Sequence, residues 1–172
     1  MDEVERLQLL ALLDESRAAV QSAVAGVNEE TARRTPGPGR WSILGCAEHI
    51  AFSEDYMFRQ IGIATTPEKP LINREREAKM LARGADRSRR MESPPQGHPV
   101  GKFPTLAAAM AHFLLCRERT IAFVQDSHQD LRAQLTWHPI LKDCNCHEML
   151  LSIGLHALRH ARQIEEIKAE LA

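Results

Sequence analysis

The sequence predicts an all-α fold, a four-helix bundle with a long irregular connection between its second and third helices. Two observations support this. Helix-forming Ala, Leu, Glu, Arg and Gln dominate, whereas the chain has one Tyr and five Phe and few other strand-forming residues. Four stretches of apolar periodicity, each about 20 to 27 residues long, would span roughly 30–40 Å, which suits bundle helices. Because the chain has 172 residues, we expect one domain over residues 1–172.

The first predicted helix covers residues 2–27, where apolar residues recur at helical spacing and charged residues fill the positions between them. Gly26 and Asn28 are typical stop signals at its end. A Pro-Gly-Pro-Gly run at 36–39 then predicts a loop, because proline lacks a backbone donor and glycine permits positive φ.

The second predicted helix covers residues 42–63 and starts at Ser42, a good N-cap just after Trp41. The connection that follows, residues 65–104, holds six of the prolines. A charged stretch at 73–91 inside it is compatible with a short helix. Unbroken loops beyond about 12–15 residues are uncommon in compact domains and are often lids or flexible segments.

The third predicted helix covers residues 105–126 and carries a near-heptad seam suited to a bundle. The seam consists of Leu106, Met110, Phe113, Arg117, Ile121 and Val124. Leu131 and Leu135 predict a short turn of helix after it. The fourth helix starts at Asn145, where Glu148 three positions on makes an Asn-led capping box, and it runs to about residue 171.

Charge and apolar patterning exclude several function classes. The chain has 22 Lys and Arg against 23 Asp and Glu, a net charge of -1, so we expect no nucleic-acid partner. Without an apolar stretch of roughly 18 residues or an export signal, we expect a cytoplasmic protein that does not enter a membrane. A reducing compartment suits the cysteines, as buried hydrophobes or reactive thiols. They are Cys46, Cys116, Cys144 and Cys146.

Histidine is the unusual residue, with eight copies. His156 and His160 are four positions apart, so their side chains lie one turn apart on one face of the fourth helix. That face is otherwise mostly apolar. Its neighbours are Met149, Ile153, Ala157, Ile164 and Ile167. Two inward imidazoles fit one shared metal ion, and they also fit a pair of hydrogen-bonded core histidines.

His49 is the candidate third ligand, on the second predicted helix. It lies in a row with small, aromatic or weakly polar residues, which leave space beside a ligand. That row consists of Gly45, Cys46, Phe52, Ser53 and Tyr56. Three histidines from two helices would leave coordination positions open, as in a catalytic rather than a structural metal site.

Several motifs, taken in order, resemble the DinB-like superfamily over nearly the whole chain. They are Trp41-Ser42, Glu48-His49, Thr105-Leu106 with Arg117, His138-Pro139, and His156-Ala-Leu-Arg-His160-Ala-Arg-Gln163-Ile164. The resemblance implies an up-down-down-up four-helix bundle in which His49, His156 and His160 hold a divalent ion such as zinc or nickel. Members of that family include thiol-dependent S-transferases and isomerases and metal-dependent hydrolases.

The resemblance therefore implies a metal-dependent transferase or hydrolase acting on a small-molecule substrate, such as a low-molecular-weight thiol. It also implies a homodimer. The leucines of the first helix agree with one, because they cover more than one face, although two neighbouring helices of the same chain would cover both faces as well. These leucines are Leu9, Leu10, Leu12 and Leu13. The alternative is a non-enzymatic bundle or dimeric binding protein that an ion merely stabilises.

Other chemistry-bearing residues receive lesser roles. We expect Gln163 and Tyr56 near the pocket as groups that orient a ligand or substrate. Glu48 lies about 100° round the helix from His49 and is not expected to be a base. A second zinc site is a weaker interpretation, since Cys-x-Cys-His is not the usual spacing of a finger or ribbon. It would use His138, Cys144, Cys146 and His147.

Overall fold

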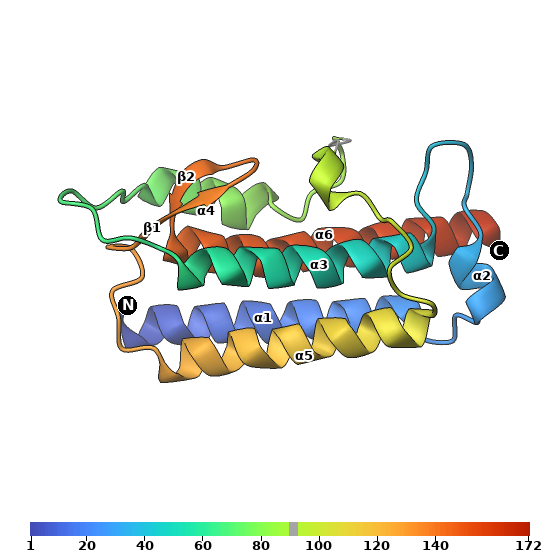
Figure 1. The fold of residues 1–172 in the computed structure, drawn as a ribbon, viewed down its shortest axis with the longest axis horizontal. Helices are drawn as coiled ribbons and strands as arrows, with labels where there is room; N and C mark the ends of the chain where they lie inside the picture. The colour runs from blue at the N-terminus through green and yellow to red at the C-terminus, as the bar shows by residue number, and fades with distance from the viewer. Residues whose placement is uncertain (90–92) are drawn as a thin grey trace.

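The computed structural model describes residues 1–89 and 93–172 and places four long helices side by side (Figure 1). These are α1 (Glu3–Val24), α3 (Ile43–Gly62), α5 (Leu106–Asp126) and α6 (Cys146–Leu171). In Figure 1, α1 and α6 run from the left end to the right, and α3 and α5 run back. This order confirms the predicted up-down-down-up bundle. None of the helices in the described part of the chain is long and apolar enough to cross a membrane.

The direction of the helices explains the long connection. Helices α3 and α5 pack side by side and point the same way, so the chain must return along the bundle before α5 can start. The 20 residues of α3 make this distance about 30 Å. The returning chain carries α4 (Arg74–Arg83) and a short 3-10 turn, η1 (Pro95–Gly97). The charged stretch does contain a helix, although its predicted end, Met91, lies outside the described residues.

Polar caps start the long helices where the sequence predicts. The side chains of Ser42 and Thr105 each accept a hydrogen bond from an N–H in the first turn of α3 and α5. Asn145 and Glu148 form the reciprocal capping box of α6, with N···O distances of 2.9 and 3.0 Å. These caps satisfy donors that the helix itself leaves unpaired, and they fix the register of the side chains along each helix.

The end of the first helix differs from the prediction in one respect. Gly26 has a φ of 73° and follows α1 as a stop signal should. Asn28, however, does not end α1. Its side chain accepts from the N–H of Thr31 and so caps α2 (Glu29–Arg33), a short helix that the sequence reading did not include.

The predicted helical turn around Leu131 and Leu135 is wrong, because a β-hairpin occupies this place. Strands β1 (Leu135–His138) and β2 (Lys142–Asn145) pair antiparallel, and Leu135 also bridges to Thr65. The spacing of the two leucines suggested a helix, but Leu131 is buried in the second core cluster ahead of the strand, and Leu135 lies in the strand and is partly exposed. The hairpin lies along the start of α6 and places His138 beside that helix (Figure 1).

The apolar interior consists of two clusters, one in each half of the bundle. The first includes Ile50 and Ala157, and the second includes Met57 and Leu155. Residue 156 therefore lies where the two clusters meet, so a polar side chain there interrupts a continuous core. Helices α1 and α6 approach closely in the second cluster, where Gly154 leaves space for Leu12. A Cβ added at Gly154 would lie 2.6 Å from Cγ of Leu12.

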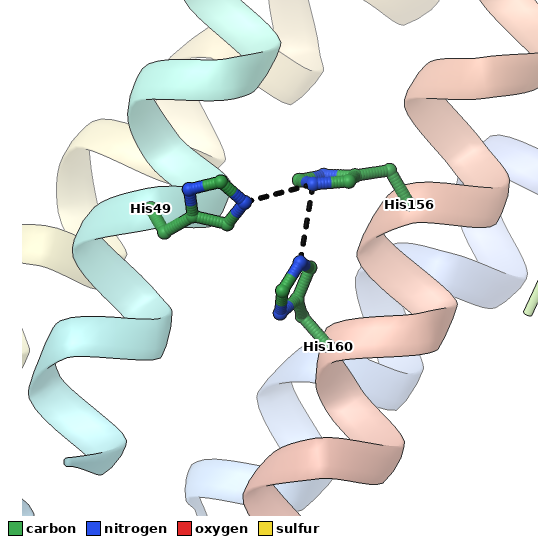
Figure 2. Close-up of side chains that lie close together, drawn as sticks. All are labelled: His49, His156 and His160. Atoms are coloured by element: carbon green, nitrogen blue, oxygen red, sulfur yellow. Dashed lines mark hydrogen bonds between the residues drawn. The ribbon is translucent and has the colours of Figure 1, made fainter. Parts of the chain in front are cut away.

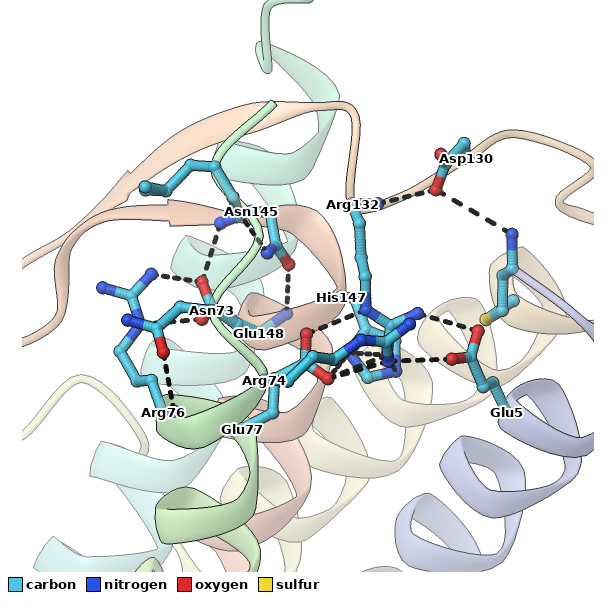
Figure 3. Close-up of polar contacts among 12 residues, drawn as sticks. Glu5, Asn73, Arg74, Arg76, Glu77, Asp130, Arg132, Asn145, His147 and Glu148 are labelled. Carbon is cyan, nitrogen blue, oxygen red and sulfur yellow. Dashed lines mark hydrogen bonds and ion pairs between the residues drawn. The ribbon is translucent and has the colours of Figure 1, made fainter. Parts of the chain in front are cut away.

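A network of ion pairs ties the returning chain to the bundle (Figure 3). The guanidinium of Arg132 donates to both oxygens of Glu77 on α4, at 2.8 Å each, and pairs with Glu5 of α1 at 2.7 Å. Arg76 of α4 pairs with Glu148 in the first turn of α6. The arginines hold the pKa of Glu5 at about 2 against the opposing effect of burial. This network fixes α4 and the hairpin beside the site described next.

Candidate metal centre

Three histidine side chains converge between α3 and α6 (Figure 2). His49 reaches in from α3, and His156 and His160 reach in from successive turns of α6. The Nε2 atom of His156 lies 2.9 Å from Nε2 of His49 and 3.1 Å from Nε2 of His160. The structure thus brings together the three residues that the sequence singled out, across 107 positions of the chain.

The backbone sets the proton position on His49. Its Nδ1 atom lies 2.5 Å from the carbonyl oxygen of Gly97, and a carbonyl can only accept, so Nδ1 carries the proton. In the neutral ring Nε2 then has a free lone pair, and this lone pair faces the other two histidines. Orientation of a ligand ring by a carbonyl on its far nitrogen is common at metal sites.

Burial keeps these imidazoles neutral. Desolvation lowers the pKa of His49 from its ordinary 6.5 to about 4, although its bond to Gly97 acts in the opposite direction. Desolvation lowers the pKa of His156 and His160 well below the ordinary value, and the neighbouring rings add to the effect. Only the neutral imidazole binds a cation, so burial prepares the form that a metal site requires.

The spacing fits one small cation. Two nitrogens bound to a tetrahedral zinc ion at 2.0–2.1 Å are about 3.3 Å apart, a few tenths of an ångström beyond the observed 2.9 and 3.1 Å. A shared cation also gives each converging lone pair a partner, as buried polar groups require. The donor set is therefore suited to a divalent ion.

His160 points its other nitrogen, Nδ1, toward the far side of the cluster. Nδ1 is buried and makes no well-formed hydrogen bond to any described residue. The side chain of Gln163 lies close to this ring, and its polar contact acts against the effect of burial, which lowers the pKa of His160. Gln163 accepts a hydrogen bond from Arg87 at 3.2 Å. The expected position of Gln163 beside the cluster is thus observed, and Arg87, which also pairs with Glu166, holds it there.

The cluster opens on the side of His156, which is partly exposed, whereas His49 and His160 are buried. One turn before His156 on α6, Ser152 is also partly exposed. Its Oγ lies 3.4 Å from Nε2 of His138, at the end of β1. Ser152 and the end of β1 therefore lie beside the partly exposed edge of the cluster.

Trp41 forms one wall of the cluster, a role that the sequence reading did not assign. Its ring centroid lies 4.7 Å from that of His49 and 6.1 Å from that of His160. The exposed His98 meets the same indole edge-on. The available signal was the position of Trp41 directly before the N-cap Ser42, where a large apolar residue commonly packs on the following helix.

The structure also places three other residues that the sequence singled out. Tyr56 lies two turns along α3 from His49 and is partly buried against the second core cluster, and its expected role beside the pocket stays a prediction. Cys46 is fully buried, and burial raises the pKa of its thiol to about 12, as suits a packing residue. Glu48 is buried and binds backbone N–H groups of the returning chain, so it is not positioned as a base.

The alternative zinc site does not assemble. Cys144 and Cys146 are buried in the second core cluster, and this burial raises the pKa of each thiol to about 12. His147 accepts from Arg132, and Nδ1 of His138 accepts from two backbone N–H groups. Among residues 1–89 and 93–172, the group of metal-ligand type that converges is the histidine trio.

Comparisons with known proteins agree with the fold. A family model described as the DinB superfamily matches residues 12–164. The uncharacterized protein YuaE of Bacillus subtilis (strain 168) is 21% identical over 162 residues, which are 94% of this chain and 98% of YuaE. The solved structure of YfiT from Bacillus subtilis matches with a TM-score of 0.67 and 16% identity, over 99% of this chain and 90% of YfiT. YfiT is described as a probable metal-dependent hydrolase with an unusual four-helix bundle topology.

Proposed function

The chain belongs to the DinB superfamily, and we propose that it is a metal-dependent enzyme of the hydrolase type whose ion is held by His49, His156 and His160. The convergence of three neutral imidazoles, whose ligand atoms lie within 4.8 Å of one another, carries this proposal. The description of YfiT as a probable metal-dependent hydrolase supports the reaction class. Imidazole ligands suit zinc and nickel, which are the ions we propose.

The residues around the proposed ion orient its ligands and shield one side of the cluster. His49, His156 and His160 would hold a divalent ion with its full charge, and the ion would supply the Lewis-acid chemistry that hydrolysis requires. Gly97 fixes the ring of His49, and Trp41 shields the buried side of the cluster from solvent. His156 is the partly exposed member of the trio, so we expect substrate to approach on its side.

His138 and Ser152 act at this open side as hydrogen-bonding groups. The N–H groups of Ile140 and Leu141 both donate to Nδ1 of His138 at 3.1 Å, so the neutral ring carries its proton on Nε2. His138 therefore donates to Ser152 and cannot take its proton, which excludes a nucleophilic serine activated by this histidine. The hydroxyl proton of Ser152 stays available to a substrate at the open side.

Elemental analysis of the purified protein tests metal binding. We expect about one divalent ion per chain in the wild type and a large loss in His156→Ala, because one of three ligands is removed. His128→Ala is the matched control, since His128 is an exposed histidine outside the cluster, and it should keep the ion. A wild-type protein that takes up neither zinc nor nickel, with His156→Ala equally stable, would end the metalloenzyme proposal.

A reaction screen of the metal-loaded protein tests the class. We expect hydrolysis of small ester, amide or phosphoester substrates, with loss of turnover in His156→Ala. Transfer of several low-molecular-weight thiols, measured in the same screen, distinguishes an S-transferase from a hydrolase. Metal binding without either reaction would favour the alternative of an ion that only stabilises the bundle.

A further inference from the structure

The carboxylate of Glu48 holds one end of a segment that crosses α3 beside the histidine cluster. We call residues 97–102 the strap. Glu48 is 1% exposed and accepts hydrogen bonds from the backbone N–H groups of Val100 at 2.6 Å, Gly101 at 3.1 Å and Lys102 at 3.0 Å. Gly101 has a φ of 75°, which lets three successive N–H groups turn toward one anion.

No lysine or arginine side chain among the described residues forms an ion pair with Glu48. A buried carboxylate without such a partner is costly unless hydrogen bonds compensate the lost hydration. Hydrogen bonds to an ionised acceptor are about twice as strong as neutral ones. The strap is therefore the group that keeps the Glu48 carboxylate stable inside the protein, and the carboxylate in turn fixes the strap.

The other end of the strap touches the next residue of α3. The carbonyl of Gly97 accepts from Nδ1 of His49 at 2.5 Å. A Cβ at Gly97 would lie 3.2 Å from Cε1 of His49, so the backbone rests directly on the imidazole. Between the two ends, Pro99 has a fixed φ and packs close to Gly45 of α3. Both attachments thus belong to one short, restrained segment.

We propose that Glu48 is a positioning residue for the metal centre. By anchoring the strap, it holds the Gly97 carbonyl against Nδ1 of His49 and so fixes the tautomer whose Nε2 lone pair faces His156. Glu48 touches neither the other ligands nor the open side, and it acts only through the strap. This inference rests on the proposed function for its consequence, because the benefit is tighter binding of the ion.

The test uses Glu48→Ala and Glu48→Gln in the full chain. Gln keeps the size of Glu and one acceptor oxygen, so it remains informative if Ala impairs folding, and circular dichroism shows whether each variant is helical. Glu54→Gln is the control for loss of a buried carboxylate on α3, because Glu54 pairs with Arg117 rather than with the strap. This variant should lose stability through the broken ion pair, while the tautomer of His49 and the zinc affinity of the folded protein stay unchanged. Two readouts are compared at pH 7.5.

The first readout is the tautomer of His49 in the metal-free protein, taken from long-range 1H–15N spectra. We expect the Nδ1–H form in the wild type and in Glu54→Gln, and a mixture of tautomers in Glu48→Ala. The second readout is zinc affinity, measured by competition with a chromophoric chelator. Loss of a group that orients a metal ligand typically costs 10–100-fold in affinity, so we expect about tenfold or more for Glu48→Ala, less for Glu48→Gln and no change for Glu54→Gln.

The outcomes separate this inference from the proposed function. Folded Glu48 variants with the wild-type tautomer and wild-type zinc affinity would overturn it, as would an equal loss of affinity in Glu54→Gln. If the wild type binds no zinc or nickel but the tautomer of His49 changes in Glu48→Ala, the positioning role stands and the metal proposal fails.

Discussion

The buried pair of Arg117 and Glu54 offers a sharp test of how the bundle is held together. Arg117 is completely buried and donates to both carboxylate oxygens of Glu54 at 2.8 Å each. It also donates to the carbonyl of Leu13 at 2.6 Å and to the hydroxyl of Ser16. One guanidinium therefore connects α5 to α3 and to α1. The variant Arg117→Met removes the charge while keeping much of the volume.

The expected loss in free energy of unfolding follows from the carboxylate that Arg117→Met leaves unpaired. In Arg117→Met, the carboxylate of Glu54 stays buried with the hydroxyl of Thr120, at 3.1 Å, as its remaining partner. Removing one member of a buried ion pair costs about 3–5 kcal/mol. For a domain of this size, each kcal/mol shifts the melting temperature by about 2–4 °C. We therefore expect a decrease of roughly 6–20 °C.

Urea unfolding followed by circular dichroism measures this loss, with the slope checked so that a change in midpoint reports stability. The double variant Arg117→Met with Glu54→Leu removes both charges, and we expect it to recover most of the loss, since apolar replacement of a whole buried pair is often neutral or stabilising. A single variant within about 1 kcal/mol of wild type, or a double variant no better than the single one, would refute the reasoning.

Three further predictions concern the ion, pH and assembly. A chelator at pH 7.5 should lower the melting temperature, zinc or nickel should restore it, and His49→Ala should abolish the rescue; a melting curve that ignores verified metal removal contradicts a stabilising ion. Burial lowers the pKa of His138 and His147 from 6.5 to about 4. Between pH 6.5 and pH 4 these histidines are therefore protonated in the unfolded chain but neutral in the folded one. The free energy of unfolding should be highest above pH 6.5 and fall toward pH 4. Urea titrations at several pH values measure this, and a flat profile contradicts it. A homodimer, which we propose, should double the mass of the 19.4 kDa chain in light scattering at micromolar concentration, and the mass of a single chain would exclude it.

Local signals in the sequence predicted the parts of the structure that short stretches of chain determine. The caps at Ser42, Thr105 and Asn145 depend on residues within one turn, so the starts of three long helices could be read directly. The inward direction of His156 and His160 follows from their position on a stripe of buried residues. The same periodicity placed Arg117 in the seam of its helix, where it is buried.

Contacts between distant residues account for what the sequence did not predict. The partner of Arg117 is Glu54, 63 positions away, and the carbonyl that orients His49 belongs to Gly97, 48 positions away. Neither a carbonyl nor a backbone N–H group has a signature in composition or periodicity. The strands around His138 were missed because each has four residues, too few for an alternating pattern to stand out.

The leucines of α1 show why a residue pattern alone could not decide whether the chain forms a homodimer. Leu9 and Leu13 are buried inside the chain, and Leu10 and Leu12 pack against the second core cluster. Neighbouring helices of the same chain thus cover these leucines.

The order of the helices has a consequence for how the protein folds during synthesis. Helix α1 packs along α6, so the element that leaves the ribosome early must wait for one that is made after all the others described here. Until α6 emerges, most of the α1 interface has no partner, and two of the three histidines do not yet exist. Contacts between such distant segments slow folding, because the chain must close a long loop before it gains their energy. We therefore expect folding to be completed largely after α6 emerges, with the histidine cluster among the last features to form.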